Sequence, residues 1–141
     1  METFFKKIEE IIRNCRIKYY QIMNRKGEDF MKEYTGDKIR NVAIVGHGGA
    51  GTTSVTEALL YRSGAISRMC KVEDGATTTD YEPEEIKRKV SVNATLAPVE
   101  WRDTKINFID TPGFADFVAE VKGAFRAVDS ALIVVCATSG V

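Results

Sequence analysis

A glycine-rich segment at residues 46–51 constrains the fold of this chain more than any other feature. An apolar run precedes it over residues 39–45, and a run with helical spacing follows it over residues 53–62. A buried strand, a flexible turn and a helix N-terminus in this order are typical of a phosphate-binding loop, because the N–H groups of the turn converge and the helix dipole adds positive partial charge. The segment therefore predicts an α/β domain with an anion site after its first strand.

The segment fits the pattern G-x-x-x-x-G-K-[ST] at every defined position but one. Gly46 and Gly51 are the two glycines and Thr53 fills the last position, whereas Thr52 stands where the pattern has Lys. That lysine reaches the β- and γ-phosphates as a point charge, and a threonine hydroxyl carries no charge. The sequence predicts a phosphate-binding loop of weakened affinity, and a glycine-rich turn without a ligand is the alternative.

Composition argues against several other functions. The 141 residues suit one domain, and 20 Lys and Arg balance 20 Asp and Glu, so the overall charge favours neither nucleic acid nor an anionic membrane. No apolar run approaches the roughly 20 residues of a membrane span. Three widely spaced cysteines and one histidine form neither a disulfide framework nor a zinc site, which predicts reduced thiols in a cytoplasmic protein.

Residues 1–30 differ from the rest of the chain and predict an amphipathic helical extension. Their apolar residues recur at spacings of three and four, with charged residues on the other face. The apolar set is Phe4, Ile8, Ile11, Ile12, Cys15, Tyr19, Ile22 and Met23. Such a helix packs on its own domain or on a partner, and its glutamates disfavour a membrane surface. Residues 31–141 are then the α/β domain.

The later segments complete an α/β pattern. Residues 67–89 lack periodicity, residues 90–99 and 105–109 predict an antiparallel hairpin, and an amphipathic helix is expected over residues 117–128. The apolar residues 131–137 are typical of a central parallel strand that is buried on both faces.

The turn Asp110-Thr111-Pro112-Gly113 follows the second hairpin strand. An Asp at the C-terminal end of a strand is where a nucleotide site holds a carboxylate close to Mg²⁺. Alone, these four residues would be an ordinary β-turn. Some 60 residues after a phosphate-loop pattern, the turn predicts the second half of a nucleotide site.

With both motifs in place, residues 31–141 resemble the start of the GTP-binding domain of elongation-factor-G-like translational GTPases. The resemblance is strongest over residues 39–47, 59–66, 110–113 and 129–135. It implies a P-loop NTPase fold of about four strands, a guanine nucleotide (GTP or GDP) with Mg²⁺ as ligands, and the ribosome as partner.

The resemblance also implies roles for individual residues. Thr53, Ser91 and Asp110 would hold or sense Mg²⁺, with Ser91 inside the segment 88–92, where the family usually has R-G-I-T-I. Gly113 would donate its N–H toward a γ-phosphate. The nucleotide-binding residues implied are Gly46, His47, Gly48, Gly49, Ala50, Gly51, Thr52, Thr53, Asp110 and Gly113.

Two further departures from the family accompany Thr52. Phe114 occupies the position of a histidine that orients the attacking water, and the N-K-x-D segment that reads guanine does not occur in these residues. Whether the domain hydrolyses GTP stays open. Two alternatives are a non-catalytic interaction module and a fragment of an interrupted gene. Without a following strand, residues 131–137 would form an exposed, aggregation-prone sheet edge that could take a partner strand or helix.

Overall fold

The computed structural model describes residues 34–138 and 140. The helix predicted within residues 1–30 lies outside the described residues. The described chain forms, in order, η2 (Gly36–Lys38), β1 (Ile39–Gly46), α2 (Thr52–Arg62), η3 (Val72–Asp74), α3 (Pro83–Arg88), β2 (Thr95–Trp101), β3 (Thr104–Asp110), η4 (Ala115–Phe117), α4 (Val118–Phe125) and β4 (Ser130–Val134). The order strand, helix, two strands, helix, strand follows the sequence prediction, and α3 is an addition to it. None of the described helices has the length and apolarity to span a bilayer.

The sheet has four strands in the order β2-β3-β1-β4. β1 pairs in parallel with both β3 and β4, whereas β2 and β3 form the predicted antiparallel hairpin. Arg102 and Asp103 have φ of 46° and 62°, the left-handed values that a two-residue hairpin turn requires. The first strand therefore lies between the hairpin and the last strand, and the predicted α/β fold is confirmed.

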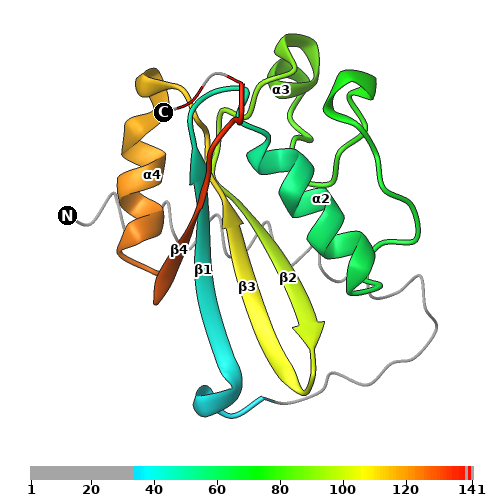
Figure 1. Ribbon diagram of the computed structural model, residues 1–141, viewed down its shortest axis with the longest axis vertical. Coiled ribbons are helices and arrows are strands. Elements are labelled where there is room, and N and C mark those ends of the chain that lie inside the picture. Colours follow the sequence, from blue (N-terminus) through cyan, green and yellow to red (C-terminus); the bar gives the residue numbers. More distant parts are fainter. Residues whose placement is uncertain (1–33, 139, 141) are drawn as a thin grey trace.

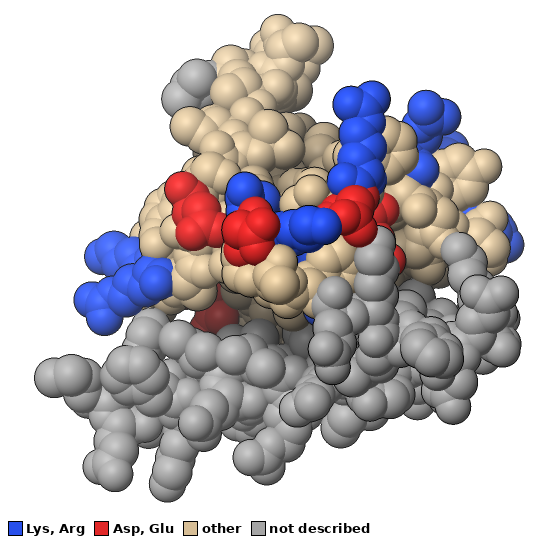
Figure 2. Space-filling model, turned by 90° about the horizontal axis from the view of Figure 1, so that it is seen from below, with Lys and Arg blue, Asp and Glu red and all other residues tan. Residues whose placement is uncertain are grey.

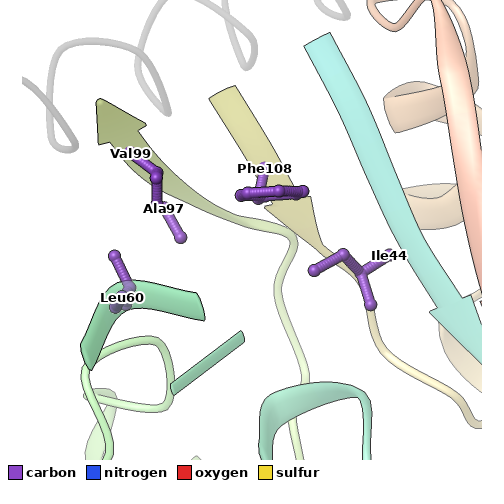
Figure 3. Close-up of a cluster of buried hydrophobic side chains, with 5 residues drawn as sticks. All are labelled: Ile44, Leu60, Ala97, Val99 and Phe108. Carbon is purple, nitrogen blue, oxygen red and sulfur yellow. The ribbon is translucent and has the colours of Figure 1, made fainter. Parts of the chain in front are cut away.

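A small apolar core lies between the sheet and α2. Ile44 of β1, Leu60 of α2 and Phe108 of β3 are buried together with Ala97 and Val99 of β2, and their side chains point into the same space (Figure 3). α2 and α4 lie on opposite sides of the sheet (Figure 1). The packing of α2 on β1, β2 and β3 fixes the start of this helix at the end of β1, which places the glycine-rich loop.

The segment between α2 and β2 differs from the prediction. Residues 67–89 contain the short elements η3 and α3, and the strand predicted from residue 90 begins only at Thr95. The N–H groups of Val92 and Asn93 donate to the buried Glu85 carboxylate, 3.0 and 3.1 Å away, and not to a neighbouring strand. Because these donors are taken by a side chain, residues 90–94 do not join the sheet.

The last strand also differs from the prediction. β4 is parallel, as expected, but it is shorter than residues 131–137 and lies at one edge of the described sheet. Burial on both faces is wrong, since Ile133 is 70% exposed and Leu132 and Val135 are also exposed. The described part of α4 leaves Val118 and Phe125 half-exposed, so its apolar face is only partly covered.

The end of the sheet opposite the glycine-rich loop carries charges of both signs. Figure 2, a view from that end, shows acidic and basic side chains next to one another. Lys38 of η2 pairs there with Asp103 of the hairpin turn. This end of the described residues therefore presents charges of both signs and not a field of a single sign.

Candidate nucleotide-binding site

The glycine-rich loop connects the end of β1 to the first turn of α2. Gly49 and Gly51 have φ of 82° and 98°, left-handed values at which a side chain would be strained. Gly51 is the N-cap of α2 and offers no side chain to the first-turn N–H groups. These groups have no acceptor within the helix, so they are available to an anion at Thr52, Thr53 and Ser54.

The turn after β3 packs directly against this loop. The N–H of Gly48 donates to the carbonyl oxygen of Gly113 at 3.0 Å, and the hydroxyl of Thr111 donates to the carbonyl oxygen of Ile44 at 2.8 Å. A β-carbon on Gly113 would lie 2.6 Å from the Gly48 nitrogen, so only glycine allows this approach. The parallel pairing of β1 with β3 thus brings together two motifs that are some 60 residues apart.

A cavity of about 340 Å³ lies beside the two motifs. The loop, the turn and the segment before β2 each contribute to its wall. Its lining residues are His47, Gly48, Gly49, Gly51, Thr52, Thr53, Ser54, Val72, Glu73, Asp80, Lys89, Val90, Ser91, Gly113 and Phe114. The volume is at the lower end of the range for small-molecule sites.

Most residues predicted for the site lie on this cavity. Gly46, Ala50 and Asp110 do not line it: Gly46 is the last residue of β1, Ala50 donates its N–H to the His47 carbonyl, and Asp110 is buried at the end of β3. The ring of Phe114 lies against Gly48, where an added β-carbon would meet it at 2.8 Å. The Nδ1 atom of His47 lies 2.8 Å from the carbonyl oxygen of Gly48, within the loop itself.

Two carboxyl groups and three hydroxyl groups at the cavity form two separate sets of hydrogen bonds. The Thr53 and Ser91 hydroxyls are 3.0 Å apart, and Ser91 donates to Asp80 Oδ1 at 2.7 Å. Thr79 donates to Asp110 Oδ2 at 3.1 Å. The other oxygen of each carboxyl, Asp80 Oδ2 and Asp110 Oδ1, is buried without a hydrogen-bond partner among the described residues.

Burial dominates the acidity of this pair. It raises the pKa of the Asp110 carboxyl from 3.8 to about 7; the hydrogen bond from Thr79 opposes the change and the charge of Asp80 adds to it. Burial likewise raises the pKa of the Asp80 carboxyl, although the hydrogen bond from Ser91 lowers it in part. Two adjacent buried carboxyls with unpaired oxygens are unfavourable when ionised, and a bound cation would stabilise them.

The donor set suits a hard divalent cation that a ligand helps to hold. The candidate donors are hydroxyl and carboxyl oxygens, which Mg²⁺ prefers, and Mg²⁺ usually completes its shell with phosphate oxygens and water. Within the described residues no three or more His, Cys, Asp and Glu side chains cluster as a metal site. The residues therefore fit Mg²⁺ bound together with a phosphate better than a metal held by protein alone.

Two other buried glutamates hold the segment between α2 and β2 in place. Glu57 of α2 accepts hydrogen bonds from the N–H groups of Cys70 and Thr78, and Glu85 of α3 accepts from those of Glu82, Val92 and Asn93. Both side chains are almost fully buried. They fix the backbone on either side of Asp80, which keeps its carboxyl beside Ser91.

Sequence reasoning missed Asp80, Glu57 and Glu85. Asp80 follows three threonines in a polar segment, and its role depends on contacts with residues distant in sequence. The one available signal for Asp80 was its carboxylate, which stands in an aperiodic segment between the two nucleotide motifs. The glutamates occupy helices, where a charged residue is ordinarily expected on the solvent side.

Comparison with known proteins identifies the domain. Residues 37–141 match the family model described as "Elongation factor Tu GTP binding domain". The chain is similar to elongation factor G 2 of Treponema pallidum (strain Nichols), with 41% identity over 104 residues that cover 74% of this chain and 15% of that protein. The chain thus spans about one-seventh of the length of this relative.

Solved structures agree with this match. A crystal structure of a Thermus thermophilus protein has a TM-score of 0.72 and 48% identity, over 75% of this chain and 16% of that one. A bacterial selenocysteine-specific elongation factor has a TM-score of 0.52 and 24% identity, over 69% of this chain and 14% of that one, and it supports the fold alone. The predicted resemblance to elongation-factor-G-like translational GTPases is confirmed, and the chain belongs to the elongation factor Tu GTP-binding domain family.

Proposed function

We propose that the described residues form the phosphate- and Mg²⁺-binding half of a guanine-nucleotide site in an elongation-factor-G-like translational GTPase. One observation carries this proposal: the glycine-rich loop, the Asp110–Gly113 turn and Ser91 meet around one cavity at the C-terminal ends of β1 and β3. Ligands bind at this end of the strands in open α/β sheets.

The phosphates would lie against the loop from Gly46 to Thr53. First-turn N–H groups of α2 would donate to them, and the Gly113 N–H would approach a γ-phosphate. Thr53, Ser91 and Asp110 would hold Mg²⁺, with Asp80 as an additional carboxyl, because hydrogen bonds join Thr53, Ser91 and Asp80, and the charge of Asp80 acts on the buried Asp110 carboxyl. Bound Mg²⁺ supplies charge neutralisation of the phosphates.

Two residues make the site weak and slow. Thr52 lines the cavity without the charge that a lysine there would bring to the phosphates. Phe114 lines it with a phenyl ring, which cannot orient a water molecule by hydrogen bonding. We therefore propose nucleotide binding with hydrolysis at background rate, in a protein whose partner, as in its family, is the ribosome.

Equilibrium binding of fluorescently labelled GDP tests the proposal. Binding should be saturable, should weaken when EDTA removes Mg²⁺, and should weaken about tenfold or more in Asp110→Ala. Asp116→Ala is the matched control, since Asp116 lies in η4 shortly after the turn and outside the cavity lining. Absence of saturable binding, or equal loss in both variants, would contradict the proposal.

A second candidate function rests on the sheet edge. β4 exposes Ile133 and Leu132, and an exposed apolar edge strand is a template for pairing with another chain. An interaction module of this kind would need no nucleotide. Light scattering distinguishes the nucleotide-binding function from the interaction module. Self-association of the chain that persists in Asp110→Ala and does not respond to GDP favours the interaction module.

A further inference from the structure

We propose that Lys89 supplies the positive charge that the phosphate loop lacks at position 52. The inference rests on the proposed function and adds a binding residue to it. Lys89 and Thr52 line the same cavity, although 37 positions separate them in the sequence. A lysine side chain places its ammonium several bond lengths from the backbone, so the charge can enter from the facing segment and not from the loop.

The charges around the cavity favour this role. Lys89 is the one Lys or Arg among the described residues that line it, whereas Glu73 and Asp80 bring carboxyl groups to the same wall. Without Lys89, a polyphosphate would meet carboxylates and backbone N–H groups but no basic side chain except that of His47. Arg88, the preceding residue, is instead paired with Glu84 on the exposed side of α3.

Lys89 makes no ion pair with any residue in the described part of the chain. Its ammonium is therefore available to a ligand without breaking an existing interaction. This distinguishes it from Arg88 and from Lys38, whose charges are already matched by carboxylates.

The backbone at Lys89 is held in a conformation that favours glycine. Lys89 is the C-cap of α3 with φ of 57° and ψ of 40°, in the left-handed region. The family pattern R-G-I-T-I has glycine at this position. Glu85 fixes the backbone on both sides, since its carbonyl oxygen accepts from the Lys89 N–H and its carboxylate from Val92 and Asn93. Strained backbone positions cluster at functional sites, so the left-handed conformation of Lys89 at the cavity wall supports a role of its side chain in the site.

Binding of pyrophosphate, measured by titration calorimetry on the full 141-residue chain, tests the inference without depending on guanine recognition. Lys89→Ala should weaken pyrophosphate binding about tenfold or more, because a charge-assisted contact is lost. Lys87→Ala is the matched control: Lys87 is exposed on the same short helix and outside the cavity lining, and its loss should change affinity less than about twofold.

Two further variants separate a charge role from a structural one. Lys89→Gly should raise the melting temperature, because strain is relieved, and yet weaken pyrophosphate binding as Lys89→Ala does. In a Thr52→Lys background, Lys89→Ala should weaken pyrophosphate binding less than about threefold, because the lysine restored at position 52 supplies the charge.

The outcomes are distinguishable. Equal pyrophosphate affinity in wild type, Lys89→Ala and Lys87→Ala overturns the role of Lys89 and leaves the proposed nucleotide site intact. Loss of pyrophosphate binding in Lys89→Ala, with no saturable binding of GDP by the wild type, supports Lys89 as a phosphate ligand while the proposed guanine-nucleotide function fails. No binding of either ligand by the wild type overturns both.

Discussion

Replacing Asp110 by Asn should stabilise the protein at alkaline pH in the absence of Mg²⁺ and nucleotide. Asp110 is 2% exposed, and its Oδ1 has no hydrogen-bond partner among the described residues. Asn keeps an oxygen that can accept from Thr79 and adds an amide donor that can face the nearby Asp80 carboxylate. The substitution removes a buried charge and leaves the local shape unchanged.

The magnitude follows from the pKa of Asp110. Burial raises this pKa from 3.8 to about 7, so the native state retains a proton that the unfolded state loses. The free energy of unfolding of the wild type therefore falls as pH rises from about 4 to about 7, by an amount that corresponds to about 4 kcal/mol, and is flat above that range. The stability that the Asp110 carboxyl contributes is thus fully present below its unfolded-state pKa, and it is lost as pH rises through its native-state pKa.

Urea denaturation in EDTA at two pH values measures the effect. Asp110→Asn should gain about 2–4 kcal/mol in unfolding free energy at about pH 8 and little at about pH 4.5. Asp116→Asn, at an exposed position, should change stability by less than about 0.5 kcal/mol at both. Destabilisation of Asp110→Asn at the higher pH would show that the carboxylate is compensated in the native state, and the reasoning would be refuted.

Three other substitutions probe the site and its supports. Glu85→Ala should lower the unfolding free energy by about 3–5 kcal/mol in urea denaturation, because the N–H groups of Val92 and Asn93 lose their acceptor; a change below about 1 kcal/mol would contradict those contacts. Gly113→Ala should lower the unfolding free energy by about 1–3 kcal/mol and weaken GDP binding, because the new β-carbon would lie 2.6 Å from the Gly48 nitrogen. Wild-type stability together with wild-type GDP affinity would exclude this close approach. Phe114→His should leave single-turnover phosphate release from GTP at background, because a ring nitrogen at position 114 does not replace the phosphate-loop lysine whose place Thr52 takes; a rise of more than about tenfold would refute this.

The strand–loop–helix unit could be predicted because its signals are local. The apolar run of β1, the glycines of the loop and the helical spacing of α2 each follow from neighbouring residues. That the loop and the Asp110–Gly113 turn belong to one site followed from a family resemblance and from the rule that ligands bind at the C-terminal ends of strands in open α/β sheets. The place of the candidate site therefore follows from local patterns and this rule.

What sequence reasoning missed depends on long-range contacts. Val92 has the composition of a strand residue, yet its N–H is captured by Glu85, so residues 90–94 stay outside the sheet. Ile133 belongs to an apolar run that predicted burial on both faces, but composition alone does not say which neighbours cover a strand. Lys89 gave no signal, because its place on the same cavity as Thr52 follows from the fold of the intervening 36 residues.

The central claim is that the cavity beside Thr52 binds the phosphates of a nucleotide, and comparing three residues at this position tests it most directly. Equilibrium titration with Mg²⁺ and labelled GDP should show binding about tenfold or more tighter in Thr52→Lys than in the wild type, because a charge-assisted phosphate contact is gained. Thr52→Ala should differ from the wild type by less than about threefold, since the threonine hydroxyl adds no charge. Equal affinities for all three proteins would show that the loop does not hold phosphate and would contradict the account.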